Sequence, residues 1–239
     1  MTLRSRATYS QIINTSNNIQ NTEFVDEKSV AWQYVQMVDQ IKSLDALRSI
    51  YGEPKAASID KQLNAIDRHC RRFIENSPFL VLGTVGDVSP KGDHPGFVKV
   101  LDEKTLVIPD RTGNNRLDSL QNVIIDSRVA LIFFIPGYNE TLRVNGQGEI
   151  SKDPELLNAM HANGKLPHTL LIVHVEEAYL HCAKALLRSK LWDNESRDQD
   201  DELPPGSTII ANHCKKDPTE YTDYYQNAMD KMVEDEGHK

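Results

Sequence analysis

Residues 94–137 read HPGFVKVLDEKTLVIPDRTGNNRLDSLQNVIIDSRVALIFFIPG, and this stretch decides the fold. Runs of strand-forming residues alternate in it with turn residues. In order, it predicts a strand over 97–101, a turn at 102–104, a strand over 105–108, a polar loop over 110–115, a short helix over 116–122 and an apolar strand over 129–135. Short strands joined by tight turns are typical of a small antiparallel barrel.

The flanking residues extend this pattern on both sides. The run FLVLGTV at 79–85 predicts a strand, and the turn residues Ser89, Pro90, Gly92 and Pro95 follow it. Further strands are expected over 141–150 and 169–175, and residues 178–185 fit either a strand or a helix. The prediction is therefore a mainly β fold of five or six strands with added helices.

Helical periodicity comes before the barrel. One apolar face ends at the stop signal Gly52-Glu53-Pro54 and consists of Ile41, Leu44, Leu47, Ile50 and Tyr51. A second helix is expected through Ile59, Leu63, Ile66, Cys70 and Phe73, and stripes of this kind usually pack onto a core. The predicted organisation is a flexible tail over 1–25, a helical extension packed on the barrel over 26–76, the barrel over 77–195, and a C-terminal loop and helix over 196–239.

Composition and motifs exclude several classes of function. The net charge of −8 argues against nucleic acid as the main partner. The three cysteines form no CxxC pair, and neither His181-Cys182 nor His213-Cys214 has a further ligand at metal-site spacing, so no metal is expected. Neither GxGxxG nor GxxxxGK[ST] occurs. No apolar run has the length of a signal peptide or a membrane span, so a cytoplasmic location with no membrane partner is expected.

The order of these elements resembles the pyridoxamine-5′-phosphate-oxidase superfamily of FMN-binding split barrels. That family has Asn-Pro-Arg-Val-Ala-Leu-Phe where this chain has DSRVALIF at 126–133. The segments TLRVNGQGEIS at 141–151 and HCAKALLRSKLW at 181–192 resemble a subfamily of FMN-dependent proteins with an N-terminal helical extension. The resemblance covers roughly 40–195, and it implies a homodimer with FMN at the interface.

A polar loop is the first candidate site for that cofactor. Its cations and amides (Arg111, Asn114, Asn115 and Arg116) lie between a strand and a helix N-terminus, which suits a phosphate, although a merely solvated loop has the same composition. By resemblance, Arg116 holds the phosphate, Asn115 precedes it as a donor, Lys99 lies on the neighbouring strand, and His94 stands where the oxidase has an arginine. The strand end formed by Ile108, Pro109, Asp110 and Arg111 matches the part of the family that runs along the flavin ring.

Residues later in the chain form a second candidate group. Arg143 lies in a strand that otherwise looks buried, and it has either the flavin or a carboxylate of another chain as its partner. The cluster Lys184, Arg188, Ser189 and Trp192 carries cations and an indole, and Trp192 either stacks on the flavin or packs in an interface.

The expected activity is that of a flavin-dependent oxidoreductase acting on an unknown small substrate. The alternative is a non-catalytic protein that binds or stores flavin, and a heme or deazaflavin binder on the same barrel is a third possibility. The oxidase has an Arg-Leu-x-Asp/Glu-Arg element for its substrate, whereas this chain reads RSKLWDN at 188–194. Oxidation of pyridoxamine phosphate is therefore in doubt, and no catalytic residue is assigned.

Overall fold

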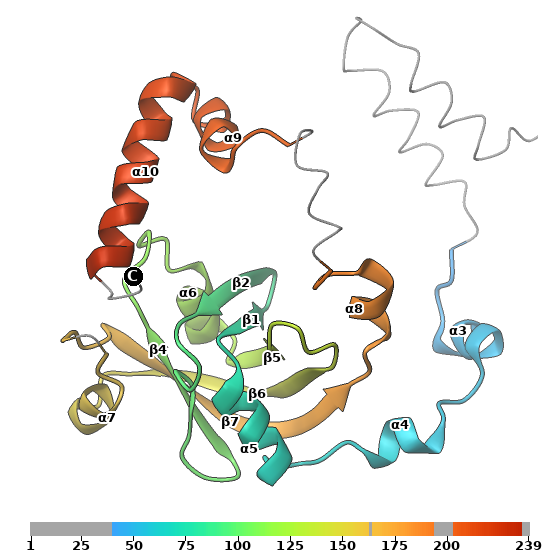
Figure 1. Cartoon of the computed structure of the whole chain (residues 1–239). Helices are drawn as coiled ribbons and strands as arrows, with labels where there is room; N and C mark the ends of the chain where they lie inside the picture. Colours follow the sequence, from blue (N-terminus) through green and yellow to red (C-terminus); the bar gives the residue numbers. More distant parts are fainter. Residues whose placement is uncertain (1–39, 163, 194–202, 236–239) are drawn as a thin grey trace, which may run out of the picture. The chain divides into compact units, whose positions relative to one another are not determined.

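The computed structural model describes residues 40–162, 164–193 and 203–235, and the predicted tail over 1–25 lies outside them (Figure 1). The chain divides into two compact units, 1–54 and 55–239. In the first unit, helix α3 (Leu44–Tyr51) begins at Ser43, whose side chain accepts a hydrogen bond from the amide of Ala46. It ends at Gly52, where φ is 68°. The apolar face predicted for this helix is present, and none of its residues is buried.

The second unit opens with α4 (Ala56–Asp60) and α5 (Arg68–Asn76), so the prediction of one continuous second helix is wrong. Between them the chain turns and bends, and the backbone of Leu63 forms an isolated bridge with that of Ala178. Asp67 then starts α5 by accepting hydrogen bonds from the amides of His69 and Cys70. This cap separates the two helices, although the apolar side chains at the end of the stripe are buried as predicted.

Seven antiparallel strands form one curved sheet, the half-barrel of a split-barrel fold (Figure 1). The strands are β1 (Phe79–Thr84), β2 (Asp87–Gly92), β3 (Lys99–Val100), β4 (Thr105–Asp110), β5 (Arg128–Phe134), β6 (Thr141–Ser151) and β7 (Thr169–His181). Their order across the sheet is β2-β1-β5-β6-β7-β4-β3. Strand β7 continues through Ala178 to His181, and Lys184 begins helix α8, so the segment 178–185, which the sequence left open, is a strand at its start and a helix at its end.

The prediction of turns at Ser89, Pro90 and Gly92 is wrong, because these residues belong to strand β2. These residues pair with β1, and Pro90 lies opposite Val81. A proline lacks the amide hydrogen that a central strand needs, and β2 tolerates it because it is at the edge of the sheet. The sequence DVSPKG has no apolar alternation, so periodicity could not reveal this strand.

The core lies on the inner face of the sheet. Alternate residues of β1, β5 and β6 are fully buried there, and Phe73 and Ile74 of α5 pack against them. Their core members are Leu80, Leu82, Leu131, Phe133, Leu142 and Val144. The register between β6 and β7 shifts at Asn145 and Gly146, and this bulge bends the longest pair of strands.

The remaining helices are short, apart from the last. They are α6 (Asp118–Ile125), α7 (Pro154–Ala159), α8 (Lys184–Ser189), α9 (Gly206–His213) and α10 (Pro218–Asp235). Helix α6 begins two residues later than predicted, and α7 has Pro154 in its first turn and Asp153 as its cap. Helix α9 begins within the segment predicted as a loop, and it contacts α10 through a hydrogen bond between the hydroxyls of Thr222 and Ser207.

Candidate functional site

The barrel is open along the edge between β2 and β4. Strand β3 pairs only with Leu106 and Val107 of β4, so the end of β4, residues 108–110, is paired on one side alone, with β7. A cavity of about 620 Å³ lies at this edge. It is lined by residues 89–92 of β2, Phe97, residues 109–117 of β4 and the following loop, residues 118–120 of α6, His168 and Thr169.

Two ion pairs span this open edge. Nζ of Lys91 lies 3.7 Å from Oδ1 of Asp110, and Nε of Arg111 donates to Oδ2 of Asp93 at 2.8 Å. Arg111 also donates from Nη1 to the carbonyl of Met160 at 3.0 Å. All four charged side chains are mostly buried, and Asp93 is only 7% exposed. Side chains therefore join β2 to β4, which are not neighbours in the sheet.

The loop that enters α6 has an unusual backbone. Asn115 and Leu117 both have positive φ, 59° and 61°. This conformation is unfavourable for leucine, which has neither a glycine's freedom nor a short polar side chain. No side chain of the described residues caps α6, and its first turn lines the cavity. Unpaired amides at a helix N-terminus carry partial positive charge, so this wall of the cavity attracts anions.

The charges around the cavity are nearly balanced. Nε of Arg116 donates to Oδ2 of Asp118 at 2.8 Å, and both side chains are exposed. The amide of Arg116 is held by Oδ1 of Asn114 at 3.0 Å. The hydroxyl oxygen of Thr169 is buried, and within the described residues it has no hydrogen-bond partner. The cavity thus offers cations, backbone amides and one unused hydroxyl to a polar ligand.

Part of the predicted cofactor set is brought together here. Six of its residues line the cavity: Pro109, Asp110, Arg111, Asn114, Asn115 and Arg116. The side chain of Ile108 belongs to the core, and Lys99 and His94 are exposed outside the cavity lining. The sequence does not point to Lys91 or the rest of β2, because the residues of that segment favour turns. His168 and Thr169 were missed because they come from a strand about 60 residues away in sequence.

The second predicted group lies elsewhere on the chain. Arg143 is on the outer face of β6, where Nη1 donates to the hydroxyl of Tyr179 at 2.8 Å. Lys61 lies over the same ring, 5.5 Å from its centroid. Trp192 donates from Nε1 to the carbonyl of Tyr138 at 2.9 Å. The other members, Lys184, Arg188 and Ser189, are exposed on α8.

The length of β7 separates the two groups. Thr169 begins this 13-residue strand and lines the cavity, whereas α8 follows its other end at His181. At ~3.3 Å per residue the strand is about 40 Å long, far longer than a flavin mononucleotide. The cavity and the α8 group therefore lie at opposite ends of β7.

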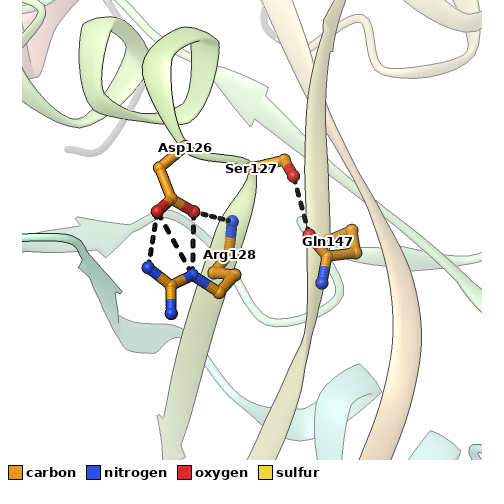
Figure 2. Close-up of polar contacts among 4 residues, drawn as sticks. All are labelled: Asp126, Ser127, Arg128 and Gln147. Atoms are coloured by element: carbon orange, nitrogen blue, oxygen red, sulfur yellow. Dashed lines mark hydrogen bonds and ion pairs between the residues drawn. The ribbon is translucent and has the colours of Figure 1, made fainter.

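Residues 126–128, which lead into β5, make structural contacts outside the cavity lining. Figure 2 shows the carboxylate of Asp126 facing the backbone amide and guanidinium of Arg128, and Nη2 of Arg128 lies 2.6 Å from Oδ2. These hydrogen bonds lower the pKa of Asp126 to about 2. The hydroxyl of Ser127 donates to Oε1 of Gln147 at 2.7 Å. The Ser127–Gln147 contact joins the start of β5 to β6, whereas the Asp126–Arg128 pair is local to the turn between α6 and β5.

Across 40–162, 164–193 and 203–235, no group of three or more His, Cys, Asp and Glu side chains is placed to hold a metal ion. Over the same ranges, no helix has both the length and the apolar character needed to cross a membrane.

Fold and site define a split barrel with an anion-attracting cavity at its open edge. Residues 66–182 match the family model for pyridoxamine 5′-phosphate oxidase. Through this segment the chain belongs to the pyridoxamine-5′-phosphate-oxidase-like family, as its sequence predicts.

Solved structures resemble the chain at low identity. HupZ of Group A Streptococcus is 20% identical, with a TM-score of 0.39 over 48% of this chain and 93% of that one. An FMN-binding protein of Syntrophomonas wolfei is 11% identical, with a TM-score of 0.39 over 58% and 97%. A general stress protein 26 relative of Clostridium acetobutylicum is 16% identical, with a TM-score of 0.35 over 47% and 85%. No curated protein matches the chain.

Proposed function

We propose that this chain is a flavoprotein that binds FMN, with the phosphate held at the cavity wall formed by Arg116 and the first turn of α6. The observation that carries the proposal is the convergence, within the family segment, of a cation, the amides of an uncapped helix and a strained loop on one cavity. Strained backbone of this kind clusters at active sites and at loops that hold ligands.

The residues present fit such a cofactor. Arg116 is exposed and paired only with Asp118 among the contacts described for it, so its planar fork can turn toward phosphate oxygens. The buried hydroxyl of Thr169 is able to donate to a ring carbonyl or a ribityl oxygen. When bound, FMN supplies hydride and electron transfer; the protein binds the phosphate, orients the ring and limits access of water.

We further propose that FMN lies between two copies of the chain. The outer face of the sheet presents Phe79, whose ring lies 6.0 Å from that of Phe134, together with the half-buried Ile132 and Arg143. An apolar face with an arginine is typical of a protein interface. The group on α8 lies about 40 Å from its own cavity along β7, and a second chain can bring its α8 group to that cavity. Sedimentation should then give twice the monomer mass, and a monomer that binds FMN with full affinity would contradict this arrangement.

The cofactor proposal is tested by titrating apoprotein with FMN and following flavin fluorescence. Arg116→Ala should weaken binding by about 1.5–3 kcal/mol, the scale of a hydrogen bond to a charged group. Arg128→Ala is the matched control, because it removes an arginine that does not line the cavity. A colourless protein that takes up no FMN would refute the proposal, and an unchanged affinity in Arg116→Ala would place the phosphate elsewhere.

For activity, we propose a flavin-dependent oxidoreductase of a small substrate, with a flavin-binding or flavin-storing protein as the alternative. The RSKLWDN segment, which lacks the oxidase's substrate element, favours a substrate other than pyridoxamine phosphate. Anaerobic reduction by NADH or NADPH, followed by a series of small oxidants, separates the two. Turnover with any of them supports the enzyme, and bound flavin that exchanges electrons with none of them supports storage.

A further inference from the structure

The open edge of the barrel lacks the backbone hydrogen bonds that hold the other strands together. Strand β2 pairs with β1 alone, and the end of β4 pairs with β7 alone. Two residues that line the cavity at this edge, Pro90 and Pro109, have no amide hydrogen to donate. The direct links between β2 and the end of β4 that the described residues show are therefore contacts between side chains.

The two ion pairs are suited to this task. In the first pair, Lys91 is on β2 and Asp110 is on β4. In the second pair the charges are reversed: Asp93 follows β2 and Arg111 follows β4. Because the charges alternate along each side, a slip of two residues would bring Lys91 toward Arg111 or Asp93 toward Asp110. Like charges at that distance repel each other. The two pairs therefore hold β2 and β4 together and also fix the position of one strand along the other.

The pairs are also part of the cavity. Lys91, Asp110 and Arg111 line it, and Asp93 holds Arg111 from outside the lining. Moving β2 away from β4 would separate the pairs and widen the cavity at the same time. Partial burial protects the pairs from screening by salt, in contrast to fully exposed pairs, which contribute little.

We propose that Lys91–Asp110 and Asp93–Arg111 form an ionic latch that closes the open edge of the barrel and limits the rate at which a ligand enters and leaves the cavity. Lys91 and Asp93 are then positioning residues: they act on the cavity through the spacing of β2 and β4. The ligand part of the proposal rests on the proposed binding of FMN, and the opening of the edge does not.

Hydrogen–deuterium exchange without ligand tests the opening directly. In Lys91→Gln and in Asp93→Asn, amides of 87–92 should exchange about three to ten times faster, while those of β5 and β6 keep the wild-type rate. The double variant Lys91→Asp with Asp110→Lys, which swaps the two charges of this pair, should return the amide exchange rate of 87–92 toward the wild-type value. Arg128→Gln is the control, because it breaks a shorter pair whose partners are two residues apart and hold no separate strands together.

The results separate a latch from general stabilisation. Unchanged exchange in both single variants overturns the proposal. Equal acceleration over the whole sheet also overturns it, because that pattern reports lost stability without local opening.

Stopped-flow fluorescence with FMN tests the effect on access. Asp93→Asn should raise the association and dissociation rate constants together, by about three- to tenfold, so that the dissociation constant changes much less than either rate. Faster exchange with unchanged FMN rates would overturn the role in access. If the wild-type protein binds no FMN, the proposed function fails on its own, and the exchange experiment still decides whether the latch exists.

Discussion

Arg116 donates from Nε to Oδ2 of Asp118 across 2.8 Å, and both residues line the cavity at the start of α6. The cation best placed for a phosphate is therefore already paired with an acid. A phosphate that binds Arg116 has to compete with this carboxylate, and it also experiences repulsion from it.

Replacing Asp118 should consequently tighten FMN binding. We expect Asp118→Asn to lower the dissociation constant by about three- to tenfold, since one negative charge near the phosphate is removed. The variant should lose about 0.3–1 kcal/mol of stability, because an acid in the first turn of a helix is favourable. Asp223→Asn on α10 is the control for net charge; weaker or unchanged binding in Asp118→Asn, measured by fluorescence titration, would contradict the competition.

The bulge between β6 and β7 requires glycine at 146. A Cβ atom on Gly146 would lie 2.0 Å from the carbonyl oxygen of His174, which is backbone and cannot turn aside. We expect Gly146→Ala to lower the free energy of unfolding by about 3 kcal/mol or more. Gly113→Ala, where nothing lies within 4 Å, should change it by less than about 1 kcal/mol. Urea denaturation measures both, and equal effects would contradict the steric argument.

The Asp126–Arg128 contact should produce a pH dependence in acid. Hydrogen bonds from Arg128 lower the pKa of Asp126 from 3.8 to about 2. A carboxyl whose pKa is lowered by folding contributes stability that is present above its unfolded pKa and lost as the pH falls through its folded pKa. The stability difference between wild type and Asp126→Asn should therefore stay constant down to about pH 4 and shrink between pH 4 and 2.

Titration of the carboxyl by NMR gives an independent check of the same contact. The midpoint for Asp126 should lie near pH 2, and Arg128→Gln should move it toward 3.8. A midpoint near 3.8 in the wild type would show that the pair does not persist in solution.

The three cysteines should differ sharply in reactivity. Burial, together with hydrogen bonding to Asp67, raises the pKa of Cys70 to about 12, whereas Cys182 and Cys214 are exposed. Because the thiolate is the reactive form, an aromatic disulfide reagent at pH 8 should modify two thiols quickly and the third only on unfolding. The variant Cys182→Ser should leave one fast thiol, and three fast thiols in the wild type would contradict the burial of Cys70.

Several parts of the fold follow from the sequence alone. The strands β1, β4, β5, β6 and β7 each contain a run of apolar or β-branched residues, and their turn residues stand where the strands end. The loop before α6 combines arginine and asparagine with a helix start, which is a local pattern. Such local features were predictable because propensity and periodicity act over a few residues.

Strand β2 and the cavity it lines depended on tertiary structure. The sequence DVSPKG has no strand periodicity, and it becomes a strand because β1 offers it hydrogen bonds at the edge of the sheet. The pairing of Lys91 with Asp110 joins residues from strands that are not neighbours in the sheet, which no local pattern reports.

The sequence by itself therefore determined the family, the antiparallel barrel and the polar loop around Arg116, since these depend on the order and composition of short segments. Only in the folded chain do the loop residues 109–116 share one cavity with Lys91 and Thr169, while the α8 group follows the other end of β7. Strand β7 begins at the cavity with Thr169 and runs for 13 residues, about 40 Å of chain, before α8 follows it.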